Sequence, residues 1–125
     1  MPLKLFFDGG CRPNPGPMET AVVARGVGYV ATDLGIGSND EAEWLAARQA
    51  LGVAHDLGAT DIVLVGDSAR IVAQANGARC GSEVLRAHRD SFLAEMATFA
   101  RVRIRRIARA RNLAGQALEA LHGRR

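Results

Sequence analysis

The sequence has few cysteines and histidines and no long apolar segment. Its two cysteines, Cys11 and Cys80, and its three histidines do not follow the spacing of zinc ligands. We therefore expect both cysteines to be free thiols in a reducing compartment. No apolar run approaches the length of a membrane span, and the first residues lack the pattern of a signal peptide. These absences favour a soluble, cytoplasmic, monomeric protein with no membrane partner.

Charge and hydropathy indicate one basic globular domain. The chain has 125 residues, of which 48% are hydrophobic and 23% are charged, enough to build one core. A net charge of +3 and a pI of about 9.5 suit a polyanionic partner without identifying it. No linker, repeat or low-complexity segment interrupts the sequence. We therefore expect a single domain over residues 1–125.

The first third of the chain predicts an antiparallel meander. Residues 3–8 are a short apolar strand, and the turn-rich residues 9–17 predict a rigid loop. Two β-rich runs, residues 19–25 and 27–33, are separated by Gly26, which can adopt the positive φ of a tight hairpin. Three antiparallel strands are expected.

The remaining residues alternate between helical and extended patterns. Apolar residues recur at helical spacing from Asp40 to the glycine at position 58, and residues 61–67 form a continuous apolar run typical of a buried central strand. Ser68 and Ser82 can cap two further helices, expected to end near residues 75 and 99. A strand at residues 101–105 and a helix at residues 112–121 follow. This order predicts an α/β fold with a five-stranded mixed sheet, three antiparallel strands then two parallel ones, flanked by helices.

Three acids are positioned to share a site. Asp8 and Asp67 each end an apolar strand, at the edge where α/β sheets bind ligands, and Glu43 lies in the first turn of the long helix. Taken alone, each acid is more simply a turn cap or a solvated helix residue. Converging carboxylates repel one another unless a cation neutralises them, and hard oxygen ligands select Mg²⁺ or Mn²⁺. Their joint placement therefore predicts a divalent-metal site.

Three motifs around these acids resemble the type 1 ribonuclease H family. Asp-Gly-Gly at residues 8–10, followed by Asn-Pro-Gly-Pro at residues 14–17, is similar to the family's first-strand motif. Asn-Asp-Glu-Ala-Glu at residues 39–43 and Gly-Asp-Ser at residues 66–68 are similar to its second and third motifs. The motifs occur in the family's order, and the resemblance covers nearly the whole chain. The resemblance implies a ribonuclease H-like fold in the compact form that lacks a basic protrusion.

The resemblance also implies an activity and a substrate. It implies an endonuclease that hydrolyses the RNA strand of RNA/DNA hybrids, with two Mg²⁺ or Mn²⁺ ions held by Asp8, Glu43 and Asp67 as catalytic residues. The substrate-binding residues that it implies include Gly9, with Asn14 and Asn39 facing the minor groove, where amides can read 2′-hydroxyl groups.

The chain departs from the family at a fourth catalytic position. Counted without gaps from the last strand, Arg109 and Asn112 match the family's Arg and Asn, and Gln116 stands where the family has an Asp. Gln116 can offer only a neutral carbonyl oxygen. A shift of one helical turn would present Asn112 instead. We take Gln116 as the fourth catalytic residue because Leu118 then also matches the family's Leu.

The same register places Arg106 where the family often has a mobile His. Arg106 continues the parity of Val102 and Ile104, so we expect it to emerge from the buried side of the strand towards the acids. An arginine there cannot exchange protons near neutral pH, but it can bind a phosphate of the substrate.

Two other interpretations share most of these features. One is a binding module for hybrids or single strands that has lost turnover with its fourth acid, and the other is a nuclease of the same fold for another substrate such as a DNA junction. The three acids argue against a pure binding module, because negative charge facing phosphates weakens binding.

Overall fold

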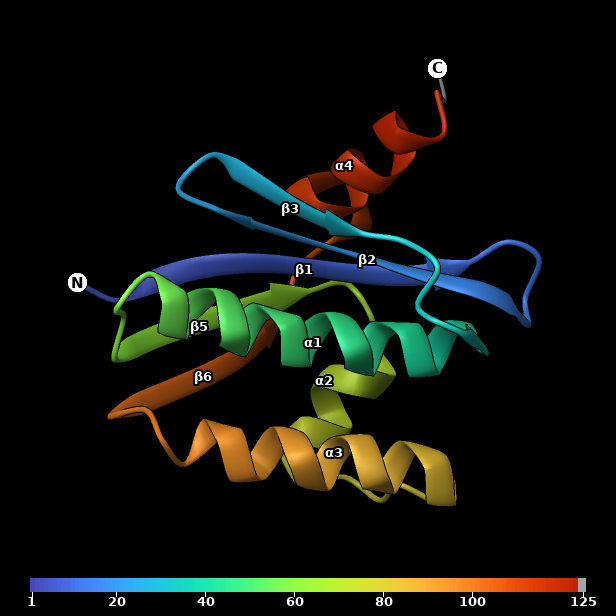
Figure 1. The fold of residues 1–125 in the computed structure, drawn as a ribbon. Helices are drawn as coiled ribbons and strands as arrows, with labels where there is room; N and C mark the ends of the chain where they lie inside the picture. The colour runs from blue at the N-terminus through green and yellow to red at the C-terminus, as the bar shows by residue number, and fades with distance from the viewer. Residues whose placement is uncertain (124–125) are drawn as a thin grey trace.

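The computed structural model describes residues 1–123, and these form one central sheet with helices on both faces. The strand order is β3-β2-β1-β5-β6, with a short strand, β4, paired to β2. In Figure 1, α1, α2 and α3 lie on one side of the sheet and α4 lies on the other. The expected α/β fold with three antiparallel strands followed by two parallel ones is confirmed.

The elements follow the order that the sequence predicts, with one added strand. The strands are β1 (Leu3–Cys11), β2 (Gly16–Ala24), β3 (Val27–Ala31), β4 (Ile36–Gly37), β5 (Asp61–Gly66) and β6 (Arg101–Arg106). The helices are α1 (Asn39–Asp56), α2 (Ala69–Ala75), α3 (Glu83–Met96) and α4 (Leu113–Leu121), with a short 3-10 turn, η1 (Arg109–Arg111), before α4. No helix within residues 1–123 is long and apolar enough to cross a membrane.

The loop expected at residues 9–17 is shorter in the structure, because both flanking strands extend into it. Gly9, Gly10 and Cys11 continue the antiparallel pairing with β2, so β1 does not end at Asp8. The connection is reduced to residues 12–15. At the start of β2, Gly16 pairs with Gly37 of β4, a two-residue strand that no sequence pattern indicates.

Two other boundaries differ for local reasons. β3 ends at Ala31, and Asp33 then adopts a φ of 55°, which is incompatible with a continuing strand. α3 ends at Met96, before the expected position, where the Thr98 hydroxyl donates to the Glu95 carbonyl. Such a side-chain bond replaces the helical backbone bond and favours the end of a helix.

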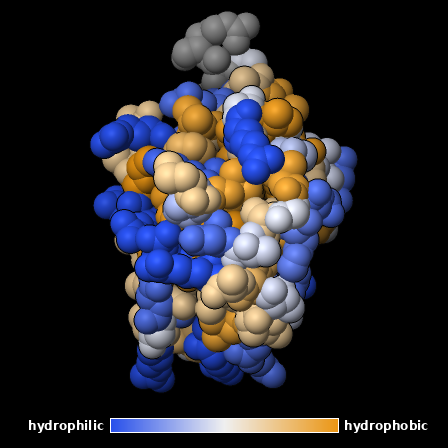
Figure 2. All heavy atoms as spheres, turned by 90° about the vertical axis from the view of Figure 1, so that its left-hand side faces the viewer, coloured by the Kyte–Doolittle hydropathy of each residue, from blue (hydrophilic) through white to orange (hydrophobic). Residues whose placement is uncertain are grey.

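The main core lies between the sheet and helices α1, α2 and α3. Trp44 is fully buried there, and its indole Nε1 donates to Oε1 of Gln74 at 3.0 Å. A smaller cluster under α4 covers the other face of β1 and β2. Figure 2 shows the end of the molecule where β5 and β6 begin, with hydrophobic residues mainly in its upper half and hydrophilic ones along its lower edge. The carboxyl ends of these two strands point away from this surface.

Candidate active site

The three acids come together where the parallel pairing of the sheet ends. β1 pairs with β5 from Leu3 to Phe6, and Asp8 follows on β1 beyond the last paired residue. Asp67 directly follows β5, and Glu43 projects from the first turns of α1. One carboxylate oxygen from each residue lies within 4.8 Å of the others. The sheet edge and the helix thus assemble one compact carboxylate cluster.

Gly9 permits the close approach of α1 to β1. A Cβ atom at Gly9 would lie 2.1 Å from the carbonyl oxygen of Ala42, so no side chain fits between strand and helix. The Gly9 N–H donates to Oε1 of Glu43 at 3.1 Å in a buried hydrogen bond. Gly9 therefore fixes the Glu43 carboxylate beside Asp8, and its only backbone donor is occupied within the protein.

Burial and mutual repulsion disfavour ionisation of these acids. Burial, and then the negative charge of Asp67, raise the pKa of Asp8 from 3.8 to about 7. Burial, then Asp8 and Asp67, raise the pKa of Glu43 from 4.5 to about 9. The Arg109 guanidinium, whose Nη2 lies 3.8 Å from Oδ1 of Asp67, opposes both shifts. Ionising all three acids is therefore unfavourable, and a bound cation would offset that cost.

The donor set of the cluster fits a hard divalent cation. Asp8 and Glu43 are 8% and 7% exposed, and the Asp67 side chain is 4% exposed, so few water molecules can hydrate the carboxylates. Oxygen ligands in such a pocket select Mg²⁺ or Mn²⁺ over softer metals. The cluster opens into a cavity of about 370 Å³, which Arg109, Asn39 and α4 also line. This cavity offers room for a ligand beside the acids.

The chain closely resembles ribonucleases H in sequence and structure. A sequence profile of the family described as reverse transcriptase-like matches residues 7–120. The crystal structure of ribonuclease H1 from the halophilic archaeon Halobacterium salinarum has a TM-score of 0.90 and 31% identity, over 98% of this chain and 99% of that chain. The chain belongs to the type 1 ribonuclease H family. The resemblance to this family that the three motifs indicate is thereby confirmed.

Two further relatives define how far this similarity extends. Ribonuclease HI of Halobacterium salinarum is 38% identical over 78 residues, and the match covers 58% of this chain but only 39% of that relative's length. The crystal structure of LC11 ribonuclease H1 in complex with an RNA/DNA hybrid has a TM-score of 0.84 at 23% identity, over 93% of this chain and 92% of that chain. The latter shows the common ribonuclease H fold.

Asn112 holds Asp67 and does not present a free oxygen to the cluster. Its Nδ2 donates to Oδ2 of Asp67 and to the carbonyl of Phe7, both at 3.0 Å. Its Oδ1 accepts from the backbone N–H of Ala114, which caps α4. Both ends of this fully buried amide are thus occupied. The geometry gives Asn112 a positioning role, which the sequence pattern alone does not reveal.

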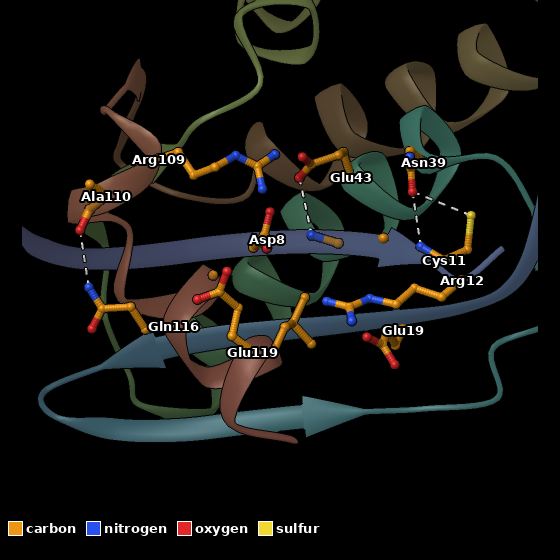
Figure 3. A pocket seen from close by; sticks show the side chains of 14 residues that line it. Asp8, Cys11, Arg12, Glu19, Asn39, Glu43, Arg109, Ala110, Gln116 and Glu119 are labelled. Carbon is orange, nitrogen blue, oxygen red and sulfur yellow. Dashed lines mark hydrogen bonds between the residues drawn. The ribbon is translucent and has the colours of Figure 1, made fainter. Parts of the chain in front are cut away.

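Gln116 lines the cavity but is turned away from the acids. It is exposed, and its Nε2 donates to the carbonyl of Ala110 at 3.2 Å, as Figure 3 shows. The residue of α4 that points at the cluster is Gly115. A Cβ atom there would lie 3.4 Å from Oδ2 of Asp8 and 3.9 Å from Oδ2 of Asp67. Gly115 was not singled out from the sequence, although a glycine inside a short helix is a signal of close approach.

Asn39 lines the other end of the cavity, and Asn14 lies next to it. The Asn39 Oδ1 accepts the backbone N–H of Cys11 at 3.0 Å, and the Asn14 Oδ1 accepts the backbone N–H of Asn39 at 3.2 Å. The Cys11 Sγ contacts both amide oxygens, at 3.4 and 3.6 Å. Because each amide oxygen is held inside the protein, each NH₂ group remains as a donor with no partner among residues 1–123.

Of the two arginines singled out near the acids, only Arg109 lines the cavity. Figure 3 shows its guanidinium beside Glu43 and above Asp8. Arg106 is the last residue of β6, paired with Gly66, and it is exposed and does not line the cavity. Arg12 also lines the cavity, next to Asn39.

Proposed function

We propose that this protein is an endonuclease that hydrolyses the RNA strand of RNA/DNA hybrids, using two Mg²⁺ or Mn²⁺ ions at Asp8, Glu43 and Asp67. The observation that carries the proposal is the buried cluster of three carboxylates at the mouth of a cavity in a type 1 ribonuclease H fold. The hybrid found in the structure of LC11 ribonuclease H1 supports the same class of substrate. We further propose that the protein acts in the cytoplasm as a monomeric, single domain.

In this proposal, some side chains bind the metal ions and others bind the hybrid. Divalent ions, when bound, activate a water molecule and stabilise the leaving 3′ oxygen. Asp8, Glu43 and Asp67, whose carboxylate oxygens lie within 4.8 Å of one another, would hold the ions. Gly9 and Asn112 keep the carboxylates in place through their hydrogen bonds.

Selectivity for the hybrid arises from hydrogen bonds to one strand. The NH₂ donors of Asn14 and Asn39 suit the 2′-hydroxyl and base acceptors of a minor groove. Arg106 and Arg109 are cations close to the site that can bind phosphates of the scissile strand. Because these contacts read sugar and phosphate more than base edges, the sequence preference is low. Gln116 contributes at most a neutral contact.

The experiment is a cleavage assay with labelled RNA/DNA hybrid, duplex RNA, duplex DNA and a DNA junction. Wild type should cut the hybrid only in the presence of Mg²⁺ or Mn²⁺, and Asp67→Asn should remove cutting without unfolding the protein. Asp56→Asn is the matched control, because Asp56 ends α1 and does not line the cavity. Preferred cutting of another substrate would favour a different nuclease. Tight hybrid binding without cutting would favour the binding module, and cutting in excess EDTA would overturn the metal role.

A further inference from the structure

One face of α4 points at the carboxylate cluster. Gln116, which stands where the family has its fourth catalytic Asp, is not on this face. Gly115 marks this direction, because its Cβ vector leads to Oδ2 of Asp8. With about 100° between successive helical residues, Gln116 lies about 100° away from this direction. Glu119, four residues after Gly115, lies only about 40° away. Glu119 is therefore the acidic residue of α4 that shares the face turned towards the metal site.

The side chain of Glu119 also extends in the required direction. Side chains on a helix lean towards its amino terminus and cover the preceding turn, which for Glu119 is the turn of Gly115. Because Gly115 has no side chain, this turn approaches Asp8 closely, and an added Cβ would lie 3.4 Å from Oδ2 of Asp8. Glu119 lines the same cavity as Asp8 and Glu43, and Figure 3 shows its carboxylate pointing towards Asp8.

We infer that Glu119 is the fourth carboxylate of the metal site. It takes the place of the Asp that the family has where this chain has Gln116. This inference rests on the proposed function, because it concerns the same ions. Glu119 is outside the group of three acids whose oxygens lie within 4.8 Å of one another. Glu119 would therefore hold the cation through one of its water molecules, since Mg²⁺ keeps several waters when it binds to proteins. Four carboxylates would then balance the charge of two divalent cations.

The test is calorimetric titration of the protein with Mg²⁺ and with Mn²⁺ in the absence of nucleic acid. Glu119→Gln removes the charge and keeps the shape, and it should weaken metal binding roughly tenfold, as loss of an outer-shell partner does. Glu19→Gln is the matched control, because Glu19 lines the same cavity but belongs to β2 and not to the face of α4 that approaches Asp8. Its effect should stay below about twofold, as for a distant charge in the same field.

A second variant tests the close approach of α4 to Asp8 at Gly115. A Cβ atom at this position makes only ordinary contacts, and alanine favours a helix, so Gly115→Ala should fold at least as well as wild type. The added methyl group would nevertheless lie against Oδ2 of Asp8 and Oδ2 of Asp67, on the helix face that Glu119 shares. Gly115→Ala should therefore weaken Mg²⁺ binding as Glu119→Gln does, and combining the two changes should add little.

The outcomes separate this inference from the proposed function. Wild type that binds neither Mg²⁺ nor Mn²⁺, with Asp67→Asn indistinguishable from it, would overturn the proposed metal site itself. A different result would overturn the role of Glu119 alone. In that case wild type binds metal and Asp67→Asn weakens this binding, but Glu119→Gln and Glu19→Gln bind metal with equal affinity. Urea unfolding in EDTA checks that each variant is folded, so a lost metal response can be assigned to the site.

Discussion

Asn112 donates from Nδ2 to Oδ2 of Asp67 at 3.0 Å, and the same nitrogen donates to the carbonyl of Phe7. One buried amide therefore joins β1, the end of β5 and the cap of α4. The amide group suits this position because both partners are acceptors. A residue at position 112 that lacks the NH₂ group leaves two buried acceptors without a donor.

Replacing Asn112 by aspartate should therefore destabilise the metal-free protein. Asn112→Asp sets a carboxylate against the Phe7 carbonyl and Asp67, and we expect a loss of about 2 kcal/mol or more in the free energy of unfolding. Gln116→Asp, a change at an exposed position, should stay within about 0.5 kcal/mol of wild type. Urea denaturation in EDTA measures both. Equal stability of the two variants would contradict the positioning role of Asn112.

The metal-free protein should lose stability as the pH rises. The pKa values of Asp8 and Glu43 are raised in the folded state to about 7 and about 9, so the folded protein binds more protons than the unfolded chain. The stabilisation is fully present below the unfolded pKa values near 4, and it is lost as the pH rises through 7 and then 9. Thermal unfolding in EDTA from pH 5 to about 9.5 measures this slope.

Glu43→Gln should flatten the upper part of this profile, because it removes the group with the highest pKa. Metal affinity should show the opposite trend. Cation binding requires ionised carboxylates and releases protons, so affinity should increase with pH over the same range. A metal-free protein whose stability is constant or rises between pH 6 and about 9 would contradict the raised pKa values of the cluster.

Gly9→Ala should disrupt the packing of α1 on β1. The added Cβ would meet the Ala42 carbonyl at 2.1 Å, and backbone must move to relieve the overlap. We expect a loss of about 3 kcal/mol in the free energy of unfolding, the scale of overpacking in a core. Gly28→Ala in β3 is the control, because a Cβ there meets nothing within 4 Å. If Gly9→Ala is as stable as Gly28→Ala, the close packing of α1 on β1 does not require a glycine at position 9.

Arg109→Ala should alter the ionisation of the cluster as well as substrate binding. Arg109 lowers the pKa of both Asp8 and Glu43, so its loss should shift the pH midpoint of metal binding upward. If Arg109 also contacts a phosphate, the slope of log affinity for hybrid against log salt should fall by about 1. Metal titrations at several pH values and hybrid binding at several salt concentrations provide the two measurements.

Arg106→Ala is the matched comparison, because Arg106 does not line the cavity. It should reduce the salt slope by about 1 if its guanidinium contacts a phosphate, and it should leave the pH midpoint unchanged. An unchanged salt slope would make Arg106 a bystander. A shifted midpoint in Arg106→Ala, or none in Arg109→Ala, would contradict the electrostatic assignment of the two residues.

The fold could be predicted from the sequence because its elements carry strong local signals. The apolar run of β5, the helical spacing in α1 and the serine caps of α2 and α3 each specify their element without tertiary information. The extension of β1 to Cys11 and the short strand β4 could not be predicted. Both depend on pairing with β2, and the participating glycine and proline residues read locally as a turn.

The carboxylate cluster was also predictable, because Asp8 lies just beyond the pairing of β1 with β5, Asp67 follows β5, and Glu43 lies near the start of α1. The surroundings of the cluster were not. Counting along the chain places Gln116 at the fourth position, whereas the orientation of α4 turns Gly115 and Glu119 towards the acids. That orientation is set by the buried Asn112, whose three hydrogen bonds connect distant parts of the chain. No sequence period encodes such a contact.

The place of Asn112 in the chain also bears on when the site forms during synthesis. Asp8, Glu43 and Asp67 leave the ribosome before α4, and their elements can pair as soon as β5 has emerged. Asp67 nevertheless lacks its amide partner until residue 112 has docked. A nascent chain therefore carries an incomplete carboxylate cluster until Asn112 and α4 have been translated and have docked.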